Sequence, residues 1–172
     1  MPTPMYLYIE GEAQGPITSG ASSRDSIGSK SRAKHEDEIV VQALHHQVQK
    51  PVDNLLGQPT GPSQLKNLKI TKLVDQSSPL LWKAASTGEH MKVCIIKWYR
   101  TSASGSEEHY FSTELEEAII TGMEAEVPNC LDNRNKDFEH MEHVYFSCRA
   151  ISWRHEISAV QQSVDYSSQD ES

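Results

Sequence analysis

The chain is poor in cysteine, in long apolar runs and in positive charge, and each shortage excludes a class of protein. Among its 172 residues are 3 cysteines, an odd number that argues against a disulfide framework and favours reduced thiols. Its apolar runs, such as residues 93–96, fall far short of the about 20 residues of a membrane-spanning helix. With 16 basic and 24 acidic side chains the net charge is −8, which disfavours binding to phosphate backbones. We therefore expect neither membrane insertion nor a nucleic acid partner.

The N-terminal segment lacks the basic, apolar and small-residue regions of a secretory signal peptide. Reduced thiols point to synthesis in the cytoplasm, so export would need a route that does not read such a signal. A length of 172 residues fits one domain. We expect that domain to cover residues 1–157, followed by a polar, disordered tail over residues 158–172.

Alternation of apolar and polar residues predicts strands over most of the chain. Two long segments rich in Gly, Ser and Pro, residues 15–34 and 50–63, are predicted to be loops. The apolar side of the last element changes phase near Ala150, as at a bulge or a barrel corner. Strands are expected at residues 5–9, 39–48, 68–71, 91–100 and 143–157.

Residues 78–87 have the signals of a short helix. Ser78 is a good N-cap, Pro79 suits the first helical position and Gly88 supplies the C-terminal stop. A helix of this length is unstable alone in water, so its apolar side must dock on a sheet. The side chains expected to make this contact are Leu80, Leu81 and Ala84.

Residues 112–123 are ambiguous. Leu115, Ile119 and Met123 fit helical spacing, whereas the hairpin expected just before them favours a strand. The local pattern leans towards helix.

Together these elements predict a mainly β domain, a closed or nearly closed sheet with one short flanking α-helix and extended loops. The aromatic residues 98, 99, 110, 111 and 153 could stack on a ligand, but at strand spacing they more often fill a core. The core is expected to include Trp98, Trp153, Phe146 and Leu80.

The sequence offers no complete catalytic motif. His35-Glu36-Asp37-Glu38-Ile39 begins like a zinc-protease motif but has Ile39 where the second histidine must stand. His140 and His143 could share a metal ion on a helix, which leaves a metal-dependent hydrolase as a third-ranked hypothesis. We predict no catalytic residue, no cofactor and no metal site, and hence a protein that is not an enzyme. The two long loops instead suit contact with other proteins.

Several short motifs occur in a definite order along residues 1–157, at residues 1–4, 15–28, 68–71 and 128–130 and at seven further places. The seven further motifs are Ile9-Glu10-Gly11, His35-Glu36-Asp37-Glu38, Gly57-Gln58-Pro59-Thr60-Gly61, Ser78-Pro79-Leu80, Ile96-Lys97-Trp98-Tyr99-Arg100-Thr101-Ser102, Glu108-His109-Tyr110-Phe111 and Arg149-Ala150-Ile151-Ser152-Trp153-Arg154-His155-Glu156. In this order and spacing they resemble the Hcp family of haemolysin-coregulated proteins, which form the inner tube of bacterial type VI secretion systems. Residues 29–34, 52–56 and the tail from residue 158 depart from the family pattern.

The resemblance implies a compact β-barrel-like body of two packed antiparallel sheets, with strand rather than helix at residues 112–123. It implies a structural subunit that forms homohexameric rings, which stack into a tube and contact the sheath and spike proteins. The lumen would carry or chaperone small effector proteins during contractile export. The protein would be made in the bacterial cytoplasm and leave without a signal peptide, reaching the extracellular space or a target cell. From the length of 172 residues we expect no fused C-terminal toxin domain, which some relatives have.

For the sites, the resemblance favours contact surfaces. The loop Gly57, Gln58, Pro59, Thr60 and Gly61 is expected to contact a neighbouring subunit or ring, and the cluster His35, Glu36, Asp37 and Glu38 is a second candidate contact. The alternative function is a free secreted effector or adhesin that forms rings and acts on target cells without a sheath.

Overall fold

Strands form where apolar and polar residues alternate, and they are the main regular structure of the computed structural model, which describes residues 3–167. The strands are β1 (Met5–Gly11), β2 (Gly15–Pro16), β3 (Ile39–His45), β4 (Val48–Gln49), β5 (Gln64–Leu65), β6 (Leu68–Leu73), β7 (His90–Thr101), β8 (Glu107–Glu116), β9 (Ala118–Glu126), β10 (Met141–Ser147), β11 (Ala150–His155) and β12 (Val160–Asp165). The helices are α1 (Arg24–Ile27) and α2 (Ser78–Thr87), with 3₁₀ turns at Gly28–Lys30 and Asn133–Asn135.

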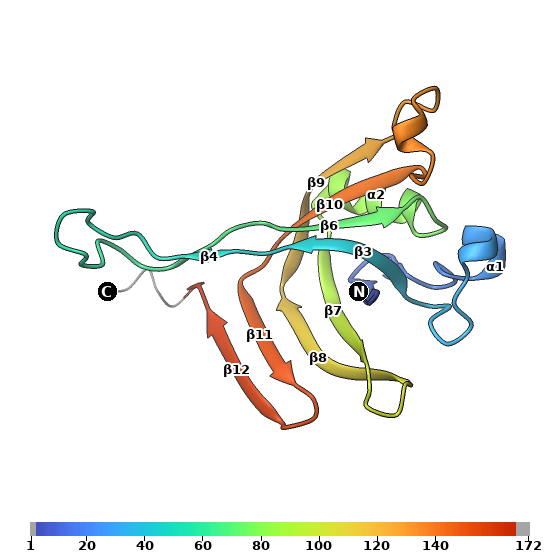
Figure 1. Cartoon of the computed structure of the whole chain (residues 1–172). Coiled ribbons are helices and arrows are strands. Elements are labelled where there is room, and N and C mark those ends of the chain that lie inside the picture. Colours follow the sequence, from blue (N-terminus) through green and yellow to red (C-terminus); the bar gives the residue numbers. More distant parts are fainter. Residues whose placement is uncertain (1–2, 168–172) are drawn as a thin grey trace.

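The main sheet closes on itself. Its order is β12-β11-β8-β7-β9-β10-β6-β3-β1-β2, and an additional pairing joins β1 to β7. β1 is therefore flanked by β3 on one side and β7 on the other, which closes β7, β9, β10, β6, β3 and β1 into a barrel. β7 pairs with β9 at its start and with β8 over its second half, so β8, β11 and β12 extend away from the ring (Figure 1). The predicted mainly β, barrel-like fold is confirmed.

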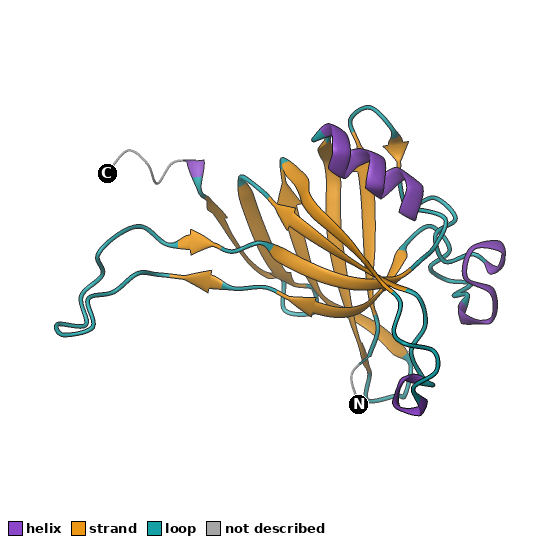
Figure 2. Cartoon of the chain, turned by 90° about the horizontal axis from the view of Figure 1, so that it is seen from above, coloured by secondary structure: helices purple, strands orange, loops and turns teal. Residues whose placement is uncertain are grey.

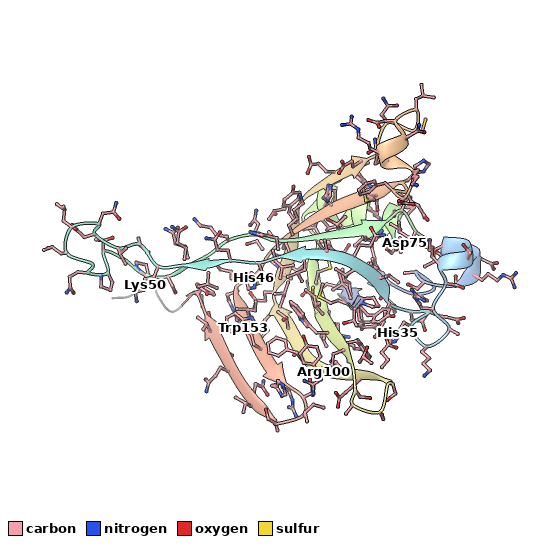
Figure 3. The ribbon with its side chains drawn as sticks, in the orientation of Figure 1. His35, His46, Lys50, Asp75, Arg100 and Trp153 are labelled. Atoms are coloured by element: carbon pink, nitrogen blue, oxygen red, sulfur yellow. The ribbon has the colours of Figure 1, made fainter. Side chains whose placement is uncertain are left out.

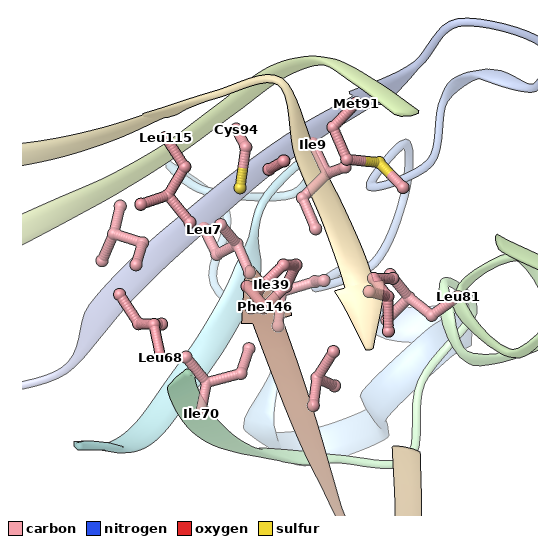
Figure 4. Packing of buried hydrophobic residues seen from close by; sticks show 14 of the residues in the cluster. Leu7, Ile9, Ile39, Leu68, Ile70, Leu81, Met91, Cys94, Leu115 and Phe146 are labelled. Carbon is pink, nitrogen blue, oxygen red and sulfur yellow. The ribbon is translucent and has the colours of Figure 1, made fainter. Parts of the chain in front are cut away.

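The core fills the barrel between β1, β7, β6 and β10. Phe146 is 1% exposed, so its predicted place in the core is confirmed. Figure 4 shows Phe146 among the aliphatic side chains of the facing strands. The other large buried apolar side chains include Tyr6, Leu7, Ile9, Ile17, Ile39, Ile70, Leu81, Ile96 and Ile151.

Trp98 and Trp153 lie at the margin of the core. Both are only partly buried and pack against the buried cluster from outside, so their predicted full burial is wrong. Trp153 pairs with Thr113 on β8, where the sheet has left the closed ring, whereas Trp98 lies at the end of the β1–β7 pairing, opposite Met5 on one side and Phe111 of β8 on the other. Trp98 Nε1 donates a hydrogen bond to Thr113 Oγ1 at 3.1 Å, and an indole whose N–H must be satisfied suits such a margin.

Helix α2 covers the predicted residues, but its N-cap is Ser77, so the prediction of Ser78 as the N-cap is wrong by one residue. The helix ends as predicted at Gly88, whose φ of 68° is the left-handed conformation that favours glycine. Leu81 and Ala84 are buried against the barrel, and the helix packs on β9 (Figures 2 and 4). Leu80 is 37% exposed, so its predicted place in the core is wrong. Residues three apart share a helix face, whereas the residue next to Leu81 is turned about 100° away from that face.

The ambiguous residues 112–123 form β8 and β9, joined at Glu117, whose φ is 49°. The local lean towards helix is wrong, and the strand implied by the resemblance is correct. Leu115 and Ile120 are both buried, one on each side of the turn. An apolar residue at every fourth position also lies on one face of a strand, so the spacing did not separate the two structures.

The expected disordered tail contains a strand. β12 pairs antiparallel with β11 from Ala150 opposite Asp165 to His155 opposite Val160, and a turn at Ala159 with φ 55° joins the two strands. The expectation of disorder from residue 158 is therefore wrong for this segment, because backbone pairing stabilises a polar edge strand that has few apolar residues. The rest of the tail, residues 168–172, lies outside the described residues.

A buried ionic cluster ties α2 to the barrel. The Lys72 side chain on β6 is fully buried, and its Nζ lies 2.9 Å from Glu142 Oε2 and 3.1 Å from Asp75 Oδ1. Ser78 Oγ donates to Glu142 Oε2 at 2.6 Å, and Trp82 Nε1 donates to Glu142 Oε1 at 2.8 Å. Burial alone raises the pKa of Glu142, but the Ser78 hydrogen bond, the Lys72 charge and the Trp82 hydrogen bond together hold it below its ordinary value.

We expect Lys72→Met to lower the free energy of unfolding by about 3–5 kcal/mol, because it leaves two buried carboxylates without their cation. Urea denaturation followed by tryptophan fluorescence measures this change. The double variant Lys72→Met with Glu142→Gln should recover part of the loss, since one uncompensated charge is removed. A Lys72→Met protein within about 0.5 kcal/mol of the parent would contradict this role for the cluster.

Candidate assembly surfaces

Residues 46–67, here called the arm, project from the body between β3 and β6 (Figure 2). β4 and β5 pair at its base, with Val48 opposite Leu65, and an isolated bridge joins Val52 to Pro59 further out. Every residue of the arm is exposed or half-buried. At the base of the arm, Leu65 packs against the core and the His46 ring stacks on Trp153, whereas the outer part of the arm has a backbone held by its own hydrogen bonds and mostly exposed side chains.

The tip of the arm has a defined shape. The Asp53 carboxylate accepts hydrogen bonds from the backbone N–H of Leu55 at 2.7 Å and of Leu56 at 3.0 Å. The Gly57 N–H donates to the Asp53 carbonyl at 2.8 Å, and Gly57 has a φ of 64°. The N–H groups of Leu56 and Leu55 hold the pKa of the Asp53 carboxyl below its ordinary value, so the carboxylate is the form that orders the turn.

This turn displays two leucines to solvent. Leu55 is 95% exposed and Leu56 is 75% exposed. Large apolar side chains are common singly on surfaces, but two adjacent ones on a shaped projection are typical of a contact site. The predicted contact loop, Gly57 to Gly61, lies beside them on the returning half of the tip. Sequence reasoning missed the leucines themselves, although an adjacent pair in a polar loop without strand or helix periodicity was a usable signal.

The cluster at residues 35–38 is divided between the interior and the surface. The His35 ring stacks on Tyr6 with 3.6 Å between ring centroids, and its Nδ1 lies 2.7 Å from Glu38 Oε2. Lys97 Nζ also contacts Glu38, so His35 and Glu38 are satisfied within the chain. Glu36 and Asp37 are exposed, which leaves these two as the members that could contact another protein. Figure 3 shows His35 on the body, well away from Lys50 on the arm, so the structure does not bring the two predicted clusters together.

A groove of about 650 Å³ lies at the far end of the barrel from the arm. It runs between α1, the end of β6 and the connection from β9 to β10. Val74 is 46% exposed, Val127 64% and Phe138 57%, and all three line the groove. The groove therefore exposes three large apolar side chains among polar ones such as Lys136 and Glu139.

The cysteines differ in exposure. Cys130 is exposed and lines the groove, whereas Cys94 is fully buried and Cys148 is half-buried. Burial raises the pKa of the Cys94 thiol, and it raises the pKa of the Cys148 thiol to about 11. A thiol that stays protonated is a poor nucleophile, so Cys130 is the accessible thiol of the three.

His143, one of the two histidines of the metal hypothesis, has both ring nitrogens engaged. Its Nδ1 lies 2.9 Å from Thr71 Oγ1 and its Nε2 lies 2.7 Å from Glu126 Oε2. Within residues 3–167, no group of three or more His, Cys, Asp or Glu side chains is placed to hold a metal ion. In the same part of the chain, no helix has the length and apolar character needed to cross a bilayer.

The arm tip and the groove both expose large apolar side chains to solvent. Residues 6–155 match the family model described as type VI secretion system effector, Hcp. The chain belongs to the Hcp family. Over 168 residues this Hcp chain is 45% identical to the Major exported protein of Pseudomonas aeruginosa, which covers 98% of this chain and 98% of that protein.

Solved structures of Hcp proteins have the same fold. One Hcp crystal structure gives a TM-score of 0.91 at 40% identity, covering 95% of this chain and 97% of the other. The structure of the secreted protein Hcp3 from Pseudomonas aeruginosa gives a TM-score of 0.80 at 39% identity, covering 95% of this chain and 98% of the other. Hcp proteins are a structural, secreted family and not an enzyme family, so the prediction that this chain is not an enzyme is confirmed and the hydrolase hypothesis falls.

We expect Asp53→Ala to loosen the arm tip without unfolding the barrel, because the two leucine N–H groups lose their acceptor. Chymotrypsin cleavage after Leu55 or Leu56, measured on dilute protein, should become severalfold faster. Asp53→Asn is the matched control, since its amide oxygen can accept the same hydrogen bonds and should preserve most of the protection. Equal cleavage rates for the parent and Asp53→Ala would contradict the proposed role of Asp53.

Proposed function

We propose that this Hcp chain is a structural subunit of the inner tube of a type VI secretion system, and that it forms hexameric rings which stack. The observation that carries the proposal is the ordered arm, which ends in two exposed leucines that no part of its own body covers. Burying a leucine side chain contributes about 1.5–3 kcal/mol, so a neighbouring copy that covers both would gain several kcal/mol.

The position of the arm supports a head-to-tail contact. The arm projects from one end of the barrel, and the body is otherwise closed by the pairing of β1 with β7. A projection that meets a different surface on the next copy makes a heterologous interface, and such interfaces generate rings when the rotation closes. A standard specific interface buries about 1,200–2,000 Å² in total, and an arm with its flanking barrel wall can supply such an area.

The family supports the remaining parts of the proposal. The tube would contact sheath and spike proteins and would hold small effector proteins in its lumen during export. The chain would be made in the bacterial cytoplasm and exported without a signal peptide, and the name of the Pseudomonas aeruginosa relative, Major exported protein, supports export. The predicted contact loop, Gly57 to Gly61, and the exposed Glu36 and Asp37 remain the proposed contacts.

Electron microscopy of the pure protein tests the ring. We expect annular particles for the parent and their loss in the double variant Leu55→Ser with Leu56→Ser. In the serine variant, the protein concentration at which half of the chains are assembled should rise about tenfold or more. The free energy lost with the apolar burial exceeds about 1.4 kcal/mol, which corresponds to a factor of ten in the assembly equilibrium. The double variant Leu55→Met with Leu56→Met is the matched control, because it keeps apolar side chains of similar volume and should still form rings.

Two results would contradict the proposal. One is a parent protein that stays monomeric at high concentration, and the other is a serine variant that assembles as well as the parent. The thermal unfolding temperature of the monomer should be the same for the parent and the serine variant, since both leucines are exposed. Co-assembly with purified sheath or spike proteins then separates the tube subunit from a free ring-forming effector or adhesin, which would form rings but bind neither.

A further inference from the structure

We propose that the base of the arm is an acid-sensitive hinge, in which a neutral His46 holds the arm against β11 and a protonated His46 releases it. His46 directly follows β3 and precedes β4, so its side chain lies where the direction of the arm is set. The inference goes beyond the proposed function, because it concerns how one chain holds its own arm. Only its effect on rings rests on that function.

The contact joins the arm to the outer strands of the sheet. The His46 ring stacks on Trp153 of β11, with 6.3 Å between the ring centroids and 28° between the ring planes. Figure 3 shows both residues where the arm leaves the body, with Lys50 further out. Trp153 packs against the buried cluster, as do Leu44, two residues before His46, and Leu65 on the returning strand of the arm. The ring of His46 therefore lies against an apolar wall.

One nitrogen of this ring is enclosed. Within residues 3–167, His46 Nε2 is buried and has no hydrogen-bond partner. A neutral imidazole can leave one nitrogen bare, whereas an imidazolium carries an N–H on both nitrogens, and enclosing a charge without a partner is costly. Burial first, and the neighbouring His45 second, hold the pKa of His46 below its ordinary value. The docked arm therefore favours the neutral ring.

The titratable neighbours of His46 on its own strand, on β6 and in the arm are basic. His45 precedes it, and Lys69 lies opposite His45 in the register of β3 with β6. Lys66, on the returning strand of the arm, has its Nζ 3.0 Å from Gln64 Oε1. Positive charges on this side add to the cost of a charged His46, because like charges repel each other.

The outer strands do not offset this cost. Thr113 on β8 and Gln162 on β12 lie opposite Trp153, and both are uncharged. Glu114, the next residue of β8, is exposed and belongs to the other face of that strand. A cation gains from an aromatic ring within about 6 Å of its centroid, and the 6.3 Å between the two rings lies just outside that range.

The remaining titratable groups of β11 and its turn have partners there. Arg154 pairs with Glu156 at 3.2 Å, and His155 Nδ1 lies 2.9 Å from Ser158 Oγ. A proton on His46 therefore meets basic neighbours on one side and an apolar wall on the other.

Acid weakens the docked position of the arm. In a released arm His46 has the ordinary pKa of histidine, about 6.5, so the released arm takes up a proton before the docked arm does. The docked position is fully stable above about pH 6.5 and loses stability as the pH falls below that value. The pairing of Val48 with Leu65 does not involve His46, so the arm changes its direction and keeps its own structure.

Tryptophan fluorescence of dilute, monomeric protein tests the hinge. The difference between the emission of the parent and that of Trp153→Phe isolates Trp153. We expect this emission to move to longer wavelength as the pH falls from about 7.5 to about 5.0, with a midpoint below about 6.5, because a released arm exposes the indole to water. Circular dichroism should stay unchanged over the same range, since the barrel remains folded.

Two variants serve as controls. His46→Phe keeps a ring against Trp153 but cannot take up a proton, so its Trp153 emission should be the same at both ends of the pH range. His45→Gln removes the neighbouring charge, so the change should persist with its midpoint closer to about 6.5. A merely structural role of His46 would leave this midpoint where it is in the parent.

Ring assembly gives an independent readout. From about pH 7.5 to about pH 5.0, the protein concentration at which half of the chains are assembled should rise severalfold in the parent relative to His46→Phe. The His46→Phe protein reports the effect of every other titrating group in a chain whose net charge is −8.

Three results would overturn the hinge. They are a Trp153 emission that is constant with pH in the parent, the same pH-dependent change in His46→Phe, and ring assembly that responds to pH equally in the two proteins. A parent protein that forms no rings at any pH would contradict the tube proposal instead, and the Trp153 emission of the monomer would still decide the hinge.

Discussion

The pairing of β1 with β7 is the contact on which the rest of the structure depends. It runs from Met5 opposite Trp98 to Gly11 opposite Met91 and turns an open sheet into a closed barrel. Leu7 and Ile9 are completely buried, and closure pairs one edge of β1 with one edge of β7 that would otherwise be exposed. Without this pairing the sheet would be open, and the arm and the groove would not be held at fixed positions relative to each other.

Because the strands of the barrel wall pair with one another, the proposed contact surface lies on a projection at one end of the barrel. The arm is ordered by its own backbone bonds at Asp53 and Gly57, so little conformational entropy is lost when a partner covers it. The buried cluster around Lys72 stabilises the opposite end, because it joins α2 to β6 and β10 close to Val74 and the groove. Rigid ends and an ordered arm suit a subunit that must repeat one geometry around a ring.

The sequence predicted the features that depend on neighbouring residues along the chain, such as the ends of a helix and the positions of strands. Pro79 and Gly88 located the two ends of α2, although the N-cap is Ser77 and not the predicted Ser78, and period-two patterns identified most strands. Features that depend on tertiary contacts were missed. The exposure of Leu80, the half-burial of Trp98 and Trp153, and the pairing of β12 all follow from which surface lies next to each residue. For the candidate site, the loop at residues 57–61 was located from turn residues, but Leu55 and Leu56 gained significance only once the arm was seen to project from the body.

Amide hydrogen exchange along the arm tests the central claim most directly, because it compares the same backbone with and without a neighbouring copy. The exchange of residues 48–66 would be measured in the assembled protein and again after dilution to monomer, with the barrel strands as internal reference. The account predicts strong slowing at Leu55, Leu56 and the adjacent tip residues in the assembly only, while the barrel is equally protected in both states. Tip amides that exchange equally fast in both states would contradict it.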